Sequence, residues 1–207
     1  MPKVKPHRTG PSLDMTPMVD LAFLLVTFFM LTAKFAPEEV VVVDTPGSTS
    51  DIKLPESNII RLLIDKDKRV FFGLESEKAK PILLNKMAAK YGVTFTEKQK
   101  NAFGGLNSFG VPIQQLGSLL SMSSEQRKEV KQPGLLSATD TVQLMDWIME
   151  ARKANVEAIG KPTFIAIKGD NNADVATVKR VIQLMQNKDI NRFNLITDLE
   201  NKPVVSR

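Results

Sequence analysis

The sequence predicts an α+β protein in which one N-terminal transmembrane helix and a flexible tether precede a small domain, a mixed sheet with helices on one face. Three patterns predict it: an apolar run near the N-terminus, a strand–turn–strand segment, and a strand–helix–strand segment near the C-terminus. We divide the chain into a cytoplasmic tail (1–14), a transmembrane helix (15–36), a tether (37–57) and an exterior domain (58–207), with an insertion at about 74–138.

The apolar run is Met15–Phe35, whose 21 residues would form a helix about 31 Å long, enough to cross the hydrocarbon core of a bilayer. Asp20 lies inside this run. A carboxylate in the middle of a membrane costs roughly 2.5–3.5 kcal/mol on insertion scales, so such a residue is by default a proton or ion carrier that faces protein or water. The alternative is a shorter span that begins near Leu21, with Asp20 as an interfacial N-cap.

Charged residues on the two sides of the run predict its orientation. Mostly basic residues precede it and mostly acidic residues follow it: Lys3, Lys5, Arg8 and Asp14 before, and Lys34, Glu38, Glu39 and Asp44 after. Since positive charge stays in the cytoplasm, we expect the N-terminus inside and the bulk of the chain outside. A cleaved signal peptide has a similar pattern, but paired small residues before a cleavage point are missing, which favours an uncleaved anchor.

Composition argues against several classes of function. The net charge of +5 comes from basic residues interleaved with acidic ones, without the aromatic residues typical of nucleic-acid binding, so we expect no nucleic-acid partner. The chain has no cysteine, and its single histidine, His7, lies in the N-terminal tail, so thiolate and histidine chemistry are excluded from the exterior domain. Asp170-Asn171-Asn172 lacks the glycine and glutamate of a calcium loop. We expect neither an enzyme nor a cofactor.

The tether and the first two strands follow the run. Val40–Val43 is a β-branched segment within a stretch rich in Pro, Gly and Ser; it is either a linker or a segment that pairs with a sheet edge in one state and releases it in another. Asn58–Asp65 is strand-like, Lys66–Arg69 would turn the chain, and Val70–Phe72 would return as a second strand.

Short helices and loops are expected in the insertion, which begins with a helical pattern at Glu75–Tyr91. A further helix is predicted at Thr139–Asn155, with Val142, Met145, Ile148 and Met149 on one face. We expect Trp147 and the methionines in the core.

The C-terminal part predicts a βαβ unit. Thr163–Lys168 alternates as a strand, Ala173–Asn187 is an amphipathic helix, and Arg192–Thr197 is the returning strand. The apolar positions of the helix are Val175, Val178, Ile182 and Met185. Strand–helix–strand order favours a right-handed crossover with parallel strands. Nothing here indicates catalysis, so we expect the domain to bind partners.

Leu13–Thr32, LDMTPMVDLAFLLVTFFMLT, resembles the membrane-anchor signature of the ExbD/TolR family: Met-Thr-Pro-Met-(Ile/Val)-Asp running into an apolar helix with paired phenylalanines. Leu54-Pro55, the strand–turn–strand segment and a terminal βαβ unit that ends in Leu-Ile-Thr are also similar to that family. The resemblance covers Leu13–Phe72 and Lys161–Asp198, and the insertion departs from the compact family pattern.

The resemblance implies a subunit of a motor driven by the proton gradient in the bacterial inner membrane, single-pass, with its N-terminus in the cytoplasm and its domain in the periplasm. It implies two anchors, from a homodimer, within a ring of ExbB/TolQ-like subunits in the lipid bilayer, and periplasmic domains that act on TonB- or TolA-like proteins. The aspartate that carries protons would be Asp20. A low dielectric favours its neutral form, so protonation can follow the side that it faces. A proton-motive force of about 150–200 mV supplies roughly 3.5–4.6 kcal/mol per charge.

Other residues would support Asp20. At about 100° per residue, Thr16, Thr27 and Lys34 lie within about 40° of it and form a polar stripe. Thr27 either helps water or a proton to pass or only bonds back to the carbonyl near position 23. Pro17 would set the geometry with which the chain enters the helix. Val41, Val43, Leu54 and Pro55 are expected to belong to the tether segment that contacts a partner.

Energising TonB-dependent transport across the outer membrane is the leading function. A TolR-like role in envelope maintenance and a passive, membrane-tethered binding protein are the alternatives. The passive protein would keep its function without the Asp20 carboxyl. A flagellar-stator relative is disfavoured, because no peptidoglycan-binding region is recognisable.

Overall fold

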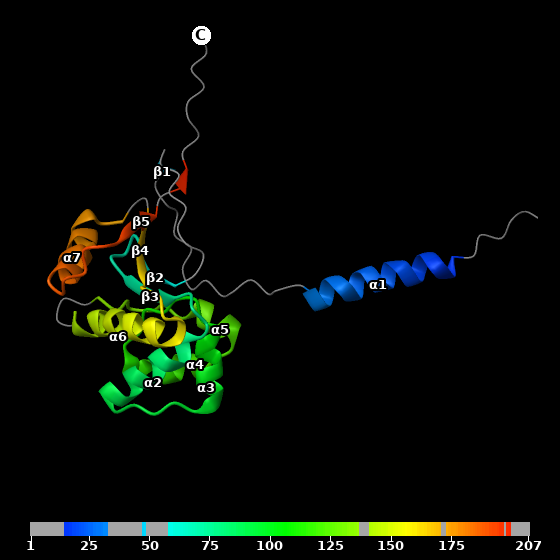
Figure 1. Ribbon diagram of the computed structural model, residues 1–207, viewed down its shortest axis with the longest axis horizontal. Helices are drawn as coiled ribbons and strands as arrows, with labels where there is room; N and C mark the ends of the chain where they lie inside the picture. Colours follow the sequence, from blue (N-terminus) through cyan, green and yellow to red (C-terminus); the bar gives the residue numbers. More distant parts are fainter. Residues whose placement is uncertain are drawn as a thin grey trace, which may run out of the picture. The chain divides into compact units, whose positions relative to one another are not determined.

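The computed structural model describes residues 15–32, 47–48, 58–136, 141–170, 173–196 and 198–199 (Figure 1). The chain separates into two compact units, Met1–Ala36 and Pro37–Arg207. Each unit is described by itself.

The first unit contains α1 (Thr16–Thr32), a helix of 17 residues. Pro17 lies in its first turn, where the missing N–H costs no intrahelical hydrogen bond. No side chain of α1 is buried, and apolar residues from Met18 to Leu31 are largely exposed. Among the residues that the structure describes, no helix has both the length and the apolar content needed to span a membrane. The transmembrane helix predicted for 15–36 is therefore not confirmed, and residues 33–36 lie outside the described ranges.

The second unit is built on a mixed four-stranded sheet in the order β3-β2-β4-β5. Its strands are β2 (Ile59–Ile64), β3 (Val70–Leu74), β4 (Phe164–Gly169) and β5 (Asn194–Ile196). β2 and β3 form an antiparallel hairpin, whereas β2 pairs with β4 and β4 with β5 in parallel. The predicted hairpin, βαβ unit and mixed sheet are confirmed.

The turn between β2 and β3 is closed by the carboxylate of Asp65. Its Oδ1 accepts from the backbone N–H groups of Asp67 and Arg69, both at 2.9 Å, and its Oδ2 accepts from Nε of Arg69 at 2.7 Å. Lys68 has a left-handed backbone (φ 64°), which reverses the chain within the charged segment predicted to turn.

A separate two-stranded pair lies outside this sheet. In it, β1 (Gly47–Ser48) runs parallel to β6 (Asp198–Leu199). The tether segment predicted to pair with a sheet edge, Val40–Val43, lies outside the described residues, so that prediction stays untested.

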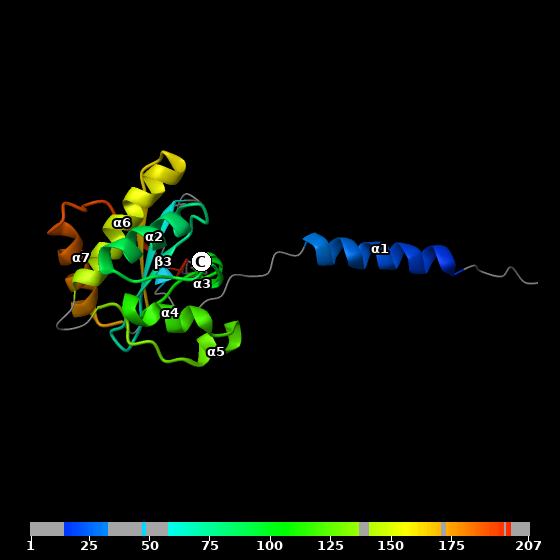
Figure 2. The same cartoon turned by 90° about the horizontal axis from the view of Figure 1, so that it is seen from below.

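Six helices complete the domain in the described ranges: α2 (Ala79–Tyr91), α3 (Glu97–Gly104), α4 (Ile113–Ser121), α5 (Ser124–Glu129), α6 (Val142–Ile159) and α7 (Val175–Gln186). Helices α2 and α6 pack together, α3, α4 and α5 gather on one side of them, and α7 lies on the other (Figures 1 and 2). Capping boxes at Thr96 and Ser123 begin α3 and α5, which explains why such short helices form within the insertion.

The core lies between one face of the sheet and these helices. Ile60, Leu62 and Ile64 of β2 contribute to it together with Ile165 and Ile167 of β4. Trp147 of α6 is fully buried and contacts the rings of Phe72, Phe103 and Phe109. Met87, Met145 and Met185 are buried as well, whereas Met149 is half-buried against the core. The core assignment is confirmed for Trp147 and these three methionines and only in part for Met149.

Two residues assigned to core faces are in fact exposed. Val142 is 63% exposed and Val175 is 64% exposed. Each is the first residue of its helix, α6 and α7 respectively, where the helix has not yet reached the elements it packs against. Val181, which the sequence pattern did not single out, is fully buried in α7.

The insertion closes the outer edge of β3. Phe72 and Phe109 exchange backbone hydrogen bonds of 2.8 and 2.9 Å, and Leu135 N donates to Val70 O at 2.7 Å. Gly73 allows this close approach, because a Cβ there would lie 2.3 Å from Asn107 O. Segments of the insertion therefore occupy hydrogen-bonding groups that would otherwise form an open sheet edge.

Candidate functional site

Asp20 is the fifth residue of α1, one turn beyond the start of the helix. Val19 N donates to Met15 O at 3.1 Å, so the helix is already hydrogen-bonded before Asp20. Asp20 therefore lies inside the helix and is not its N-cap, as the alternative had it. Whether a membrane span begins only near Leu21 stays untested.

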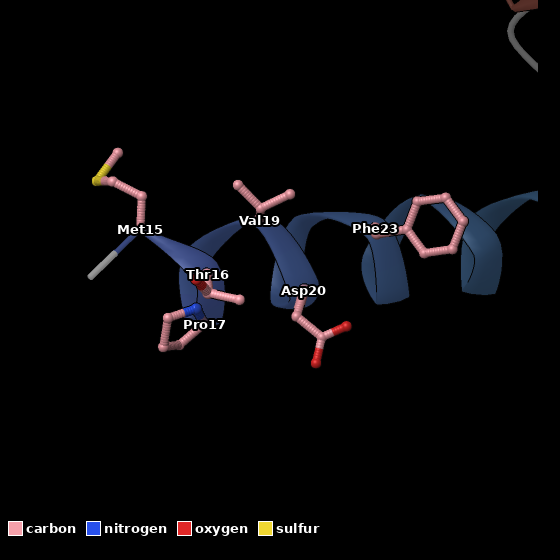
Figure 3. Close-up of a pocket in the computed structure, with 6 residues that line it drawn as sticks. All are labelled: Met15, Thr16, Pro17, Val19, Asp20 and Phe23. Atoms are coloured by element: carbon pink, nitrogen blue, oxygen red, sulfur yellow. The ribbon is translucent and has the colours of Figure 1, made fainter.

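Among the described residues, those around the Asp20 side chain are apolar apart from the Thr16 hydroxyl. An open hollow beside it is lined by Met15, Thr16, Pro17, Val19, Asp20 and Phe23 (Figure 3). The carboxylate projects away from the ribbon on the same side as the Pro17 ring, whereas Met15 and Val19 project on the opposite side (Figure 3). Asp20 is exposed, and within the described ranges no ion pair or side-chain hydrogen bond engages its carboxylate.

The two threonines of the predicted polar stripe differ in position. Thr16 begins α1 and lines the hollow beside Asp20. Thr27 lies seven residues beyond Asp20, about 10.5 Å along the helix axis. Its Oγ1 donates to Phe23 O at 3.0 Å and to Leu24 O at 2.9 Å, which is the back-bonding expected as the alternative role of Thr27. The hydroxyl can still accept a hydrogen bond, so a role in proton passage stays a prediction.

The other sequence-predicted site residues cannot be placed. Lys34 of the polar stripe and Val41, Val43, Leu54 and Pro55 of the tether lie outside the described residues. The structure thus brings Thr16 and Pro17 to Asp20 and leaves the tether residues untested.

One buried cation in the second unit was not anticipated. Lys80 of α2 is buried, and its Nζ donates to Gly104 O at 2.8 Å and to Leu106 O at 2.7 Å. Burial lowers the pKa of Lys80, opposed by the nearby carboxylates of Glu77 and Glu75. Lys80 thereby ties α2 to the end of α3. In the sequence, the only local indication that Lys80 is buried is its position one residue before Pro81, next to an apolar stretch.

Acidic residues of the second unit have structural roles. Asp174 is the N-cap of α7. The pKa of its carboxyl group is lowered, mainly by the hydrogen bond from the Thr177 hydroxyl. Across the described parts of the chain, no three Asp, Glu or His side chains gather where they could hold a metal ion.

The family model for "Biopolymer transport protein ExbD/TolR" matches residues 6–200, nearly the whole chain. The chain belongs to the ExbD/TolR family. The match runs from the N-terminal tail through α1 and the sheet to the end of β6, so the resemblance carried by the anchor signature is confirmed. No curated protein and no solved structure matches the chain.

As a member of the ExbD/TolR family, the chain is a subunit that energises biopolymer transport. Members of this family are transport motor subunits and not enzymes.

Proposed function

We propose that this ExbD/TolR-family chain is a proton-driven motor subunit of the inner membrane and that Asp20 carries the protons. The observation that carries the proposal is the position of Asp20 within α1: an acid, without a described side-chain partner, inside a helix whose other residues are apolar, hydroxyl-bearing or proline. An acid in such a helix is costly in a membrane and is kept where it has a function.

We infer that α1 lies at the centre of the membrane anchor. Its apolar side chains are exposed, with Leu21, Phe23 and Leu24 each at least 65% accessible. An apolar surface of this extent requires an apolar environment, which lipid and a ring of ExbB/TolQ-like subunits would supply. The family is typically associated with the inner membrane, which supports this assignment.

The mechanism follows from the change in charge of the Asp20 carboxyl group on protonation. Ionised Asp20 seeks water or a polar group of the ring, whereas neutral Asp20 can pass an apolar surface. Proton entry from one side and exit on the other would therefore drive α1 past the ring in one direction. The periplasmic unit would transmit this movement to a TonB- or TolA-like protein; the family works with such partners.

The test is Asp20→Asn, expressed at the normal level together with the ring subunit. Asn keeps the size and hydrogen-bonding capacity of the side chain but cannot titrate. We expect energised uptake to be lost while assembly with the ring persists, and Asp20→Glu to retain measurable activity. Full activity of the Asn variant would exclude proton carriage by Asp20 and favour the passive tethered protein.

A TonB-type role in outer-membrane transport is our first choice, and a TolR-like role in envelope maintenance is the second. Deletion of the gene should abolish TonB-dependent nutrient uptake without sensitising cells to detergent. The reverse pattern would assign the chain to the Tol-type system.

A further inference from the structure

A groove of about 500 Å³ lies on the outer side of α6, next to the segment that leads into β4. Its apolar lining comes from Met149, Val156 and Pro162. Val156 is 53% exposed, which leaves its side chain accessible. Arg152, Lys153, Glu157 and Thr163 complete the lining.

The wall formed by the chain after α6 is held in place. Helix α6 ends at Gly160, which has a left-handed backbone (φ 72°) and whose N–H donates to Val156 O at 2.8 Å. The chain then turns back toward β4, and the buried Asn155 donates from Nδ2 to Oγ1 of Thr163 at 3.2 Å. The groove is therefore preformed, which reduces the entropic cost of binding.

The charges around the groove do not cancel. Lys153 pairs with Glu150 and Glu157 pairs with Lys86, each at 2.7 Å. Arg152 has no acidic partner among the described residues. After pairing, the groove therefore presents an apolar floor and one guanidinium that is free to bind a carboxylate.

We propose that this α6 groove binds an acidic, apolar segment of a partner protein. A carboxylate of the segment would bind Arg152 bidentately, and its neighbouring apolar side chains would contact Val156 and Pro162. Charge complementarity selects this occupant, and the concave shape favours a peptide over a lipid surface, because side chains can enter a hollow whereas a bilayer cannot. The proposal goes beyond proton carriage and does not depend on Asp20.

The probe is a labelled synthetic peptide, acetyl-Gly-Leu-Glu-Val-Leu-Glu-Gly-amide, titrated with the full chain in non-ionic detergent and followed by fluorescence anisotropy. We expect saturable binding, weakened about tenfold or more by Val156→Asp or Arg152→Glu. Arg152→Glu places a negative charge opposite the peptide carboxylate, and Val156→Asp places one against the apolar side chains of the peptide. A peptide with both glutamates replaced by glutamine should also bind several-fold more weakly.

Matched controls separate the groove from general charge. Val142→Asp changes an exposed valine of the same helix outside the groove (63% accessible, against 53% for Val156), and Lys179→Glu reverses a charge on α7. Both should bind the peptide like the unchanged chain. The four substituted residues are exposed or half-buried on the surface, so we expect all variants to fold, and circular dichroism checks this.

Two results would overturn the proposal. One is peptide binding that is absent or equally affected by the groove and control variants. The other is binding to vesicles of anionic lipid that depends on Val156 and Arg152 while the peptide does not bind, which would make the surface a membrane contact instead.

Discussion

At the scale of single residues, the exposed acid of α1 and the buried lysine of α2 differ in their hydrogen-bond partners. Asp20 has no side-chain partner within the described ranges, whereas the buried Lys80 donates to two backbone carbonyls. A buried charge with hydrogen-bond partners is typical of a structural role, and an acid without them is available for reaction. The two residues therefore call for different tests.

Thr27→Val tests the polar stripe. Valine keeps the shape of threonine and removes the hydroxyl, whose hydrogen already bonds to the carbonyls of Phe23 and Leu24. Because this hydrogen is engaged, we expect motor activity in an energised uptake assay to fall by no more than about twofold. A loss as large as that of Asp20→Asn would instead assign Thr27 to the proton path.

Lys80→Met tests the buried lysine. The change leaves Gly104 O and Leu106 O without their donor, so we expect the free energy of unfolding to fall by about 1–3 kcal/mol. Urea denaturation followed by fluorescence of Trp147, the single tryptophan of the chain, measures it. Lys86→Met, which removes only a surface ion pair with Glu157, should cost under about 1 kcal/mol.

Lys80 also predicts a pH dependence. Its pKa is lower in the folded chain than the ordinary 10.5, so the unfolded chain binds more protons between these two values. The free energy of unfolding contributed by Lys80 should therefore rise with pH across that window and be smallest below the folded pKa. The difference between the unchanged chain and Lys80→Met should grow as pH approaches 10.5. A constant difference would show that burial does not disfavour the charged lysine.

At the scale of elements, the insertion does more than lengthen the chain. Its segments around Phe109 and Leu135 hydrogen-bond along the outer edge of β3, and Phe103 and Phe109 complete the aromatic cluster around Trp147. An edge strand left open is a template for pairing with other chains. The insertion thus removes one such edge, and among the described strands β5 forms the other edge of the sheet.

Gly73→Ala tests this closure. A Cβ at Gly73 would lie 2.3 Å from Asn107 O, so the insertion must move away from β3. We expect a loss of about 1–3 kcal/mol in the free energy of unfolding, typical of overpacking, together with increased aggregation on mild heating. Gly104→Ala is the matched control: nothing lies within 4 Å of its Cβ, and alanine favours the helix, so stability should not fall. Equal stability of both variants would contradict the close packing of Asn107 on β3.

At the scale of the whole molecule, α1 and the domain are separate compact units. The proposed motor requires them to act together, and the family resemblance implies that two copies do so. A chain without cysteine is well suited to a direct test, since every introduced thiol is unique in its protomer.

Single cysteines introduced at Val40, Val41, Val42 and Val43 should form disulfide-linked dimers in membranes under mild oxidation, if two tethers run side by side. A cysteine at the exposed Val142 should not cross-link and serves as the control. Failure at all four tether positions, with expression confirmed, would argue against paired tethers.

The elements that local patterns predict well are those whose pattern repeats within a few residues. The β-branched and apolar composition of Asn58–Asp65 predicts β2, alternation predicts β4 and helical spacing predicts α7. The position of Asp20 in an apolar run is enough by itself to make this residue a candidate site. These features depend on backbone geometry and on the contrast between apolar and charged neighbours, and residues close together in the sequence determine both.

Contacts between distant segments decided the rest. The pairing of Phe72 with Phe109 and the carbonyl partners of Lys80 each join segments that no local pattern connects. The exposure of Val142 and Val175 has the same origin, because burial depends on which elements pack against a helix and not on its own periodicity. Side-chain burial and partner choice are properties of the folded chain as a whole, and only the tertiary structure assigns them.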